Sequence, residues 1–230
     1  MLLTPRLAKI ASLVPRGSVL ADIGTDHGYI PCYCVKNNIC PRALAMDINQ
    51  GPLDNARDTV TNEGLTNLVS LRLSDGMNKL EYGEADTIVI AGMGGLLIKS
   101  ILENDKDKLK DGTCLILQPM LAQKELRQYL YDNDMSVENE YLAIEGSKIY
   151  NIILARKGYR YSPTPRDIII GRNIKENSPD IFENYRNREI SVRNKILTGL
   201  CKASSRDERA IDTAQYELDM FLREGTDFED

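Results

Sequence analysis

The chain has 230 residues, of which 42% are hydrophobic and 27% charged, and its formal net charge is −5. This composition is typical of a folded domain with a small appendage and excludes a largely disordered chain. The negative charge argues against a uniformly basic nucleic-acid-binding protein. No apolar run approaches the roughly 20 residues that span a bilayer, so we expect no membrane partner.

The first 155 residues predict a doubly wound α/β sheet. Helical spacing of Leu7, Ile10 and Val14 predicts an N-terminal amphipathic helix, which Arg6 and Lys9 interrupt too early for a secretory signal. Apolar runs without period-two alternation, typical of buried parallel strands, follow at Val19–Ile23, Ala43–Met46, Val69–Leu73, Thr87–Ala91 and Cys114–Leu117. Helical patterns lie between them at Ile30–Asn37, Gly51–Glu63, Leu96–Glu103 and Ala122–Asn133. This alternation is typical of a sheet with helices on both faces.

The five cysteines are odd in number, scattered and without a CxxC pair. This usage favours reduced thiols in the cytoplasm over a disulfide framework. Three of them lie between residues 32 and 40, but no fourth thiol lies near them and the chain has a single histidine. We therefore expect small buried thiols beside a strand and no metal site.

The sheet is expected to end in an antiparallel hairpin. Ser136–Glu145 and Ile149–Ala155 are strand-like runs with only three residues between them, too few for a crossover helix. These two strands must therefore run antiparallel. A parallel sheet closed by such a hairpin is the Rossmann-like sheet of class I methyltransferases and differs from the sheet of dinucleotide dehydrogenases.

A domain boundary is predicted near residues 157–167, where glycine, serine and two prolines follow an apolar run. We expect an α/β domain over residues 1–157 and a helical coiled-coil hairpin over residues 158–230. The first helix is expected to begin at Ser178 and Pro179, with a line along Phe182, Tyr185, Glu189, Val192, Ile196 and Leu200. A capping box over Ser205–Glu208 is expected to open the second, with Ile211, Ala214, Leu218 and Phe221 on one face.

Charge is distributed in three blocks. Residues 1–155 carry 15 Lys and Arg against 20 Asp and Glu, residues 156–209 carry 13 against 7, and residues 210–230 carry 1 against 7. The basic block could be the solvated surface of two helices that attract each other. It could also be a strip that contacts nucleic-acid phosphates.

The first predicted strand runs into a turn with two glycines and a carboxylate, Gly24-Thr25-Asp26-His27-Gly28. Glycines let the backbone approach a ligand, and the helix N-terminus that follows offers free N–H groups. A dinucleotide enzyme would carry GxGxxG here, and Asp26 would repel its pyrophosphate. The carboxylate suits a cationic ligand such as S-adenosylmethionine. A strained structural turn is the alternative explanation.

Polar or glycine-rich residues also follow the other predicted strands. Asp47 ends the second strand and can accept hydrogen bonds from both ribose hydroxyls, or cap the next helix. The third, fourth and fifth strands end in Ser74-Asp75-Gly76, Ala91-Gly92-Met93-Gly94-Gly95 and Gln118-Pro119. Because ligands of open α/β sheets bind at the carboxyl ends of the strands, this coincidence predicts one cofactor site.

Two side chains border this predicted site. His27 is the single histidine, and a structural role in the turn competes with a contact to substrate or cofactor. Tyr29 either packs at the start of the helix or stacks on a target base. Together with Asp26, these residues are the candidates for catalysis.

The strings Asp22–Tyr29, Met46–Ile48, Ser74–Gly76, Ala91–Gly95 and Gln118-Pro119 resemble the bacterial tRNA (adenine-22-N1)-methyltransferase family. The similarity covers roughly residues 1–157, and the helical appendage fits the family in order and length. The resemblance implies a class I enzyme that transfers a methyl group from S-adenosylmethionine to N1 of adenine 22 in tRNA. It implies a cofactor site of Asp22, Gly24, Thr25, Asp26, His27, Gly28, Asp47, Ile48, Asp75, Gly76, Ala91, Gly92 and Met93.

The expected partner is tRNA, bound by a monomeric cytoplasmic enzyme without a metal. The resemblance implies that the target base lies near His27, Tyr29 and Gly94. Because the α/β part should repel RNA, we also expect contacts from Arg160, Arg186 and Arg193, the last two on a solvent-facing side of one helix. Two other classes stay open, namely a non-catalytic nucleotide-binding or RNA-binding adaptor and a methyltransferase for a small molecule or a protein.

Overall fold

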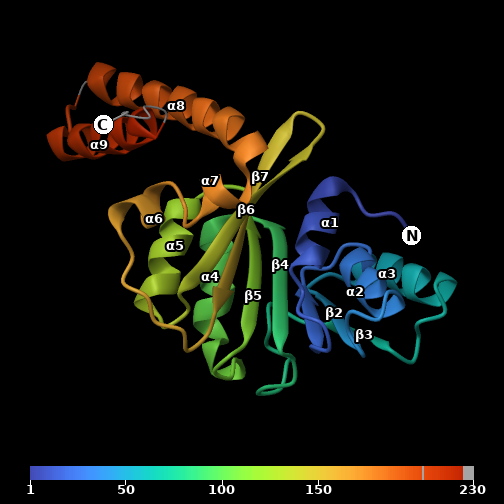
Figure 1. Cartoon of the computed structure of the whole chain (residues 1–230). Coiled ribbons are helices and arrows are strands. Elements are labelled where there is room, and N and C mark those ends of the chain that lie inside the picture. The colour runs from blue at the N-terminus through green and yellow to red at the C-terminus, as the bar shows by residue number, and fades with distance from the viewer. Residues whose placement is uncertain (204, 225–230) are drawn as a thin grey trace.

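The structure is a computed structural model that describes residues 1–203 and 205–224. A sheet of seven strands in the order β3-β2-β1-β4-β5-β7-β6 forms its centre (Figure 1). The strands are β1 (Leu20–Ile23), β2 (Ala43–Asp47), β3 (Val69–Leu73), β4 (Thr87–Met93), β5 (Cys114–Pro119), β6 (Val137–Glu145) and β7 (Lys148–Arg156). Strands β1 to β5 run parallel, and β7 is antiparallel to both β5 and β6. The predicted class I sheet is confirmed.

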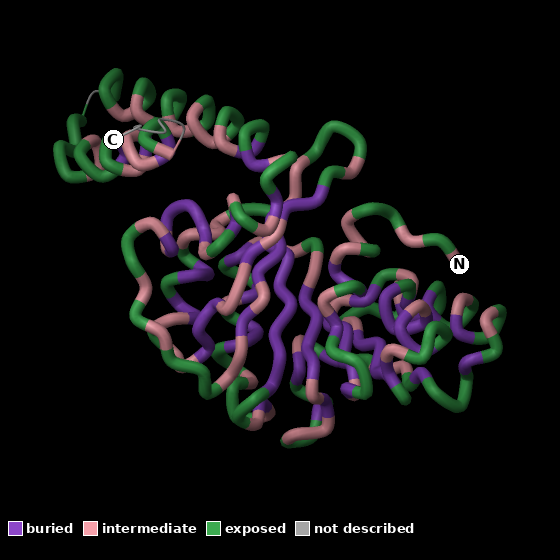
Figure 2. The backbone as a smooth tube through the Cα atoms, in the orientation of Figure 1, coloured by how far each residue is buried: buried purple, intermediate pink, exposed green. Residues whose placement is uncertain are grey.

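Helices cover both faces of the sheet (Figure 1). In strand β5, Leu115 and Leu117 pack in the layer of α4 (Gly95–Asn104) and α5 (Gln123–Asp132). Cys114 and Ile116 pack in the layer of α1 (Pro5–Ser12) and α2 (Tyr29–Lys36). The central strands are buried on both sides, which is why their sequences are continuously apolar (Figure 2). Helix α3 (Gln50–Asn62) and a 3₁₀ turn, η1 (Lys106–Lys108), lie in the same part of the chain.

Four of the five free cysteines are buried, and three of these come from the cluster near α2. Burial raises the pKa of the Cys32 and Cys114 thiols to about 11, so both are neutral thiols at physiological pH. Within the described residues, no group of three or more His, Cys, Asp or Glu side chains could hold a metal ion. No helix in that part of the chain is long and apolar enough to cross a membrane.

After β7 the described residues form four helices, α6 (Pro165–Ile169), α7 (Ile174–Asn177), α8 (Pro179–Lys202) and α9 (Glu208–Arg223). Helices α8 and α9 lie side by side and project beyond the sheet as an arm (Figure 1). Ser178 is the N-cap of α8 and Pro179 its first residue, as predicted. The expected capping box at Ser205 is wrong. Asp207 caps α9 instead, because its carboxylate directly precedes the helix and accepts the N–H of Ala210.

The face that α8 turns toward α9 differs from the predicted apolar line. Phe182 and Tyr185 are buried with Phe221 at the base of the arm, but Val192 and Ile196 are 42% and 52% exposed. The inward position is taken by Arg193, whose guanidinium carbon lies 4.2 Å from the centre of the Phe221 ring. This inward arginine has acceptors on both helices, Glu189 of α8 and, at 3.6 Å, Glu217 of α9.

A buried ion pair joins the sheet to the segment after β7. Arg127 of α5 and Glu140 of β6 lie 2.8 Å apart, with side-chain exposures of 1% and 0%. Arg127 also donates to the carbonyl groups of residues 168, 169 and 170 at the end of α6. The segment that follows the predicted boundary therefore packs closely on the α/β part, and the division at residue 157 stays a prediction.

Candidate active site

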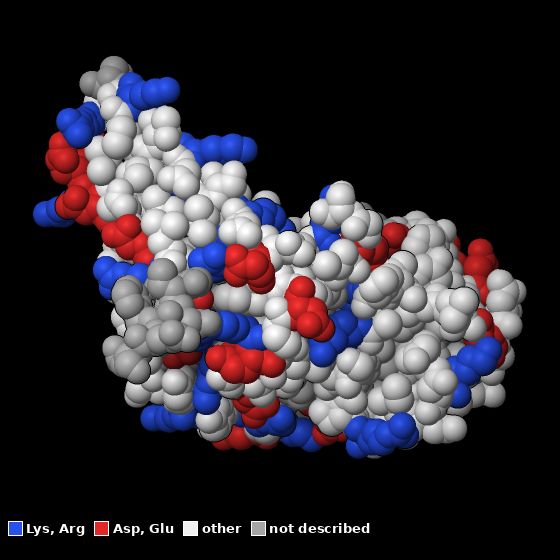
Figure 3. Space-filling view, turned by 45° about the horizontal axis from the view of Figure 1, so that its top comes forward, with Lys and Arg blue, Asp and Glu red and all other residues white. Residues whose placement is uncertain are grey.

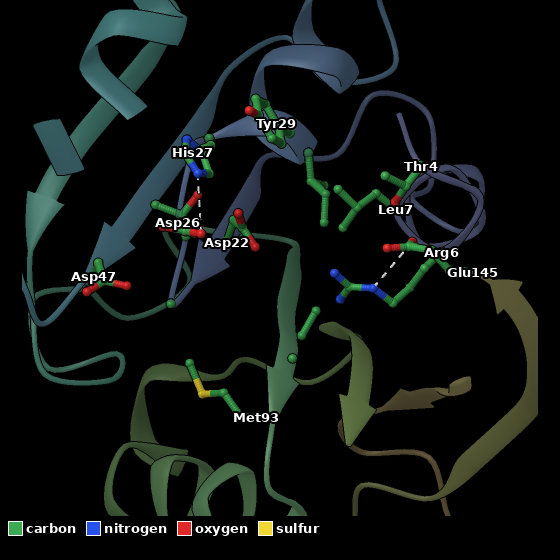
Figure 4. Close-up of a pocket in the computed structure, with 16 residues that line it drawn as sticks. Thr4, Arg6, Leu7, Asp22, Asp26, His27, Tyr29, Asp47, Met93 and Glu145 are labelled. Atoms are coloured by element: carbon green, nitrogen blue, oxygen red, sulfur yellow. Dashed lines mark ion pairs between the residues drawn. The ribbon is translucent and has the colours of Figure 1, made fainter. Parts of the chain in front are cut away.

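The cavity that holds most of the predicted site residues opens at the carboxyl ends of β1, β2 and β4 (Figure 4). Its volume is about 540 Å³, within the range of small-molecule sites. Asp47 lies at one end in Figure 4 and Arg6 with Glu145 at the other, with Asp22 and Asp26 between them. The lining residues are Thr4, Arg6, Leu7, Asp22, Gly24, Thr25, Asp26, His27, Gly28, Tyr29, Ile30, Asp47, Ala91, Gly92, Met93 and Glu145.

The turn after β1 forms one wall of the cavity. The backbone N–H groups of Gly24 and Thr25 both donate to the carbonyl of Met46, at 2.7 and 2.9 Å, which holds the turn against β2. Gly24 has a φ of +77°, and a Cβ on this residue would lie 2.0 Å from Cε of Met93. The positive φ favours glycine at this position, whereas the flexible end of the Met93 side chain could move away from a Cβ.

Asp22 and Asp26 both line the cavity but differ in environment. Asp22 is 6% exposed at the end of β1. Burial raises its pKa to about 6, with a smaller opposing effect from the Thr25 hydroxyl and a further rise from the Asp47 charge. The Asp26 side chain is 73% exposed and lies 3.4 Å from His27. The buried carboxylate of the cavity is therefore Asp22, although the sequence pattern emphasised Asp26.

Asp47 stands at the end of β2, as the sequence predicts. The alternative role as a helix cap is wrong, because the N-cap of α3 is Asn49. The Asp47 carboxylate accepts the N–H of Asn49 through Oδ1 at 2.7 Å and still reaches the cavity. This bond fixes the side chain at the rim of the cavity.

His27 and Tyr29 form a stacked aromatic pair beside the cavity. Their ring centroids are 5.0 Å apart with an interplanar angle of 9°. The His27 side chain and the whole of Tyr29 are each 40% exposed. The ring of Tyr29 is therefore not buried as a packing residue, and the pair presents an aromatic surface to the solvent.

Other predicted residues lie outside the cavity. Ile48, Asp75 and Gly76 follow β2 and β3 without lining it, and Gly94 is the N-cap of α4. Arg186 pairs with Glu183 on the surface of α8, and its side chain is only 15% exposed. Arg193 packs against α9, so the expectation that it faces solvent is wrong.

Arg160 lies near the ends of the strands that are farthest from the cavity. It pairs with Asp134 just before β6, whereas the cavity residue Glu145 ends this nine-residue strand. The two ends are therefore about 27 Å apart. The face in Figure 3 shows Lys and Arg side chains interleaved with Asp and Glu, with no continuous basic strip.

Sequence reasoning missed the contribution of α1 and the β6–β7 hairpin to the site. Arg6 of α1 donates from Nη1 to Oε1 of Gln118 at 2.9 Å, and the same oxygen accepts the N–H of Gly92 at 3.2 Å. Gln118 is fully buried, and this polar residue at the end of an apolar strand was the available signal. Nothing in the local pattern around Arg6 or Glu145 indicates that they face the same cavity.

Comparisons with known proteins agree with this geometry. A family model described as a methyltransferase domain matches residues 3–153. The tRNA (adenine(22)-N(1))-methyltransferase of Bacillus subtilis (strain 168) is 42% identical over 158 residues, which cover 69% of this chain and 66% of that protein, about two thirds. The crystal structure of the B. subtilis m1A22 tRNA methyltransferase TrmK matches with a TM-score of 0.86 and 32% identity over 96% of this chain and 98% of that one.

The chain belongs to the bacterial tRNA (adenine-22-N1)-methyltransferase family.

A second solved member of this family is M. capricolum TrmK in complex with the cofactor product S-adenosyl-homocysteine. It matches with a TM-score of 0.83 and 29% identity over 97% of this chain and 98% of that one. Because both structural matches extend over nearly the whole chain, the arm belongs to the fold shared by the family. The resemblance inferred from the strand-end motifs is confirmed.

Proposed function

We propose that this protein transfers a methyl group from S-adenosylmethionine to N1 of adenine 22 in tRNA. The observation that carries the proposal is the cavity at the strand ends, with a buried carboxylate at its centre and a second carboxylate at one end. Support also comes from the relatives, one named for this activity and one solved with the product of this cofactor.

The residues of the cavity fit the proposed cofactor. Asp47 would accept hydrogen bonds from the ribose hydroxyls, and Asp22 would face the positive end of the methionine part. A buried carboxylate without a cationic partner nearby is costly, so a cationic ligand there is favourable. The turn from Gly24 to Gly28 would let the backbone approach the ligand. When bound, S-adenosylmethionine supplies a methyl group activated by a positively charged sulfur.

The remaining cofactor assignments follow from the strand ends. Thr25, Ala91, Gly92 and Met93 line the cavity and would surround the methionine part and the cofactor base. Ile48, Asp75 and Gly76 follow β2 and β3, on the side of Asp47, and would extend the site around the adenine of the cofactor.

The target adenine would enter from the side of His27 and Tyr29. Adenine N1 has a lone pair in the plane of the ring, so the main task of the protein is to position this nitrogen. N1 belongs to the base-pairing edge, so the base must be unpaired or flipped out before it reacts. The exposed aromatic pair would offer a stacking surface for it, and the target base would pass Gly94 at the start of α4. Asp26, paired with His27, would orient that ring.

The arm would contribute the contacts to the body of the tRNA. Its first helix begins against β6, since the hydroxyl of Ser178 accepts the N–H of Leu142, three residues before the cavity residue Glu145. Along α8, Arg188 and Lys195 are exposed to solvent and could reach phosphates, while Arg186 could exchange Glu183 for a phosphate. The packing of α8 against α9 supports a short coiled coil within the predicted second domain, residues 158–230, of which the structure describes 158–203 and 205–224.

We further propose a monomer that acts in the cytoplasm. The free cysteines of the core suit a reducing compartment.

The proposal is tested with purified protein, methyl-labelled S-adenosylmethionine and tRNA transcripts that carry adenine or guanine at position 22. Nucleoside analysis should detect N1-methyladenosine in the first transcript only. Labelled protein or small molecules without labelled RNA would support the alternative substrate class. RNA binding without any methyl transfer would support the adaptor hypothesis.

A further inference from the structure

The end of the cavity opposite Asp47 carries a donor and an acceptor that the folded chain leaves largely unused. Nε of Arg6 lies 3.7 Å from Oε2 of Glu145, too far for a hydrogen bond. Within the described residues, the Glu145 carboxylate accepts no hydrogen bond, and Nη2 of Arg6 donates none. Nε of Arg6 and Oε2 of Glu145 are buried, whereas the two side chains as a whole are 21% and 29% exposed. The cavity is therefore reached by Oε1 of Glu145 and Nη2 of Arg6.

The surroundings of this pair hold it in position. Gln118 fixes Nη1 of Arg6, and the Tyr150 ring lies 5.1 Å from the guanidinium carbon. Glu145 ends β6 at the tip of the hairpin, so the pair bridges α1 and β6 across the mouth of the cavity (Figure 4). The Arg6 charge partly compensates the Glu145 carboxylate, but without a hydrogen bond this group still gains from a ligand that supplies a donor.

Adenine offers the complementary pattern on one edge. Its N6 amino group is a donor, and the neighbouring N7 is an acceptor. With N1 directed at the centre of the cavity, this edge faces one end of it. Guanine would present a carbonyl oxygen to a carboxylate at the same place, which is unfavourable.

We propose that Glu145 and Arg6 read the target adenine, with Glu145 accepting a hydrogen bond from N6 and Arg6 donating one to N7. This inference rests on the proposed function, because it assumes that an adenine enters the cavity. It names the specificity-determining residues of that site. The competing explanation is a structural clamp between α1 and the hairpin, without contact to the base.

The test combines protein and base substitutions in one cycle. Wild type, Glu145→Ala and Glu145→Gln are assayed on two RNAs. One carries adenine at the target position (adenine RNA), and the other carries unsubstituted purine, which lacks the N6 amino group (purine RNA). On adenine RNA, Glu145→Ala should lower kcat/KM about 10- to 100-fold, and Glu145→Gln, which keeps an acceptor, should lower it less. On purine RNA, Glu145→Ala should change kcat/KM less than about threefold, because the amino group is already absent.

Binding gives a second readout, independent of methyl transfer. Dissociation constants are measured for both RNAs with S-adenosylhomocysteine present. Glu145→Ala should weaken the binding of adenine RNA but hardly change the binding of purine RNA. Arg6→Gln is tested in the same way with RNA that carries 7-deazaadenine, which lacks N7, at the target position. On this RNA, Arg6→Gln should lower kcat/KM much less than it does on adenine RNA. Glu138→Gln is the matched control, since Glu138 lies on the same strand but pairs with Arg156 away from the cavity.

If Glu145→Ala lowers kcat/KM equally on adenine RNA and purine RNA, the inference is overturned and the structural clamp is supported. Unchanged kcat/KM on adenine RNA would also overturn it. If wild type methylates no adenine but the binding cycle keeps its dependence on N6, the proposed function fails while the base-reading assignment stands. Thermal unfolding of each variant shows whether a loss reflects misfolding.

Discussion

The cavity edge of the sheet, where the strands end, and the arm differ in what fixes the positions of their side chains. At the edge, ten of the thirteen expected cofactor residues line one cavity. On the arm, both helices are present, but Arg193 faces the partner helix and Val192 faces solvent. A parallel sheet fixes where every strand ends, whereas an amphipathic helix can rotate when a charged residue finds partners inside the interface.

The largest expected effect tests whether the two regions are energetically separate. Arg127→Met leaves the buried Glu140 without its cation and removes the donors to the end of α6. Burial lowers the pKa of Arg127, but the opposing effects, led by the charge of Glu140, together raise it by more. The pKa of Arg127 is therefore raised overall, and the native pair is ionised. We expect the free energy of unfolding in urea to fall by about 3–5 kcal/mol.

Arg156→Met is the control for that variant. It removes the partly exposed pair with Glu138 and should cost about 1 kcal/mol or less. If both variants cost the same, the buried pair does not hold the C-terminal segment to the sheet, and the boundary predicted at residue 157 gains support.

A second prediction tests the cavity edge through Asp47. Replacing Asp47 with Ala removes an acceptor for the ribose hydroxyls, so the affinity for S-adenosylmethionine should fall at least about tenfold. Calorimetry with the folded variant measures this loss. Asp54→Ala, in the exposed pair with Arg57 on α3, should leave the affinity unchanged. An unchanged affinity in Asp47→Ala would contradict the assignment of the ribose.

A third prediction uses the raised pKa of Asp22. Because its pKa is about 6 in the folded protein and 3.8 ordinarily, the folded state binds the proton more tightly, and stability falls as pH rises from about 4 to 6. This difference corresponds to roughly 3 kcal/mol at neutral pH. Asp22→Asn should therefore be more stable than wild type at pH 7, with the gap closing near pH 4. Urea unfolding across this pH range checks it.

The same carboxylate should link cofactor binding to pH. A cationic ligand favours ionised Asp22, so affinity for S-adenosylmethionine should rise between pH 5 and 7 in wild type and stay flatter in Asp22→Asn. Asp26→Asn and His27→Gln serve as controls, since both side chains also line the cavity. If Asp26→Asn flattens the profile instead, the exposed carboxylate is the important one.

The limits of sequence reasoning follow from what each pattern encodes. Gly24 and Asp47 were found because a strand end and a local turn are visible in neighbouring residues. Arg6 and Glu145 are 139 positions apart in the chain and meet only because α1 packs against β6. Arg193 was misplaced because its acceptor Glu217 lies on another helix. Contacts between distant segments were thus the unpredictable part of both the site and the arm.

The smallest expected effect tests which edge of the molecule meets tRNA. Lys195 on α8 and Arg160 before α6 are both exposed cations, but Arg160 lies near the strand ends that are farthest from the cavity. If the arm contacts phosphates, Lys195→Ala should flatten the dependence of log affinity on log salt by about one unit of slope, and Arg160→Ala should not. Filter binding of tRNA at several salt concentrations measures both slopes. The reverse result would place tRNA across those strand ends and restore the contact that the sequence predicted for Arg160.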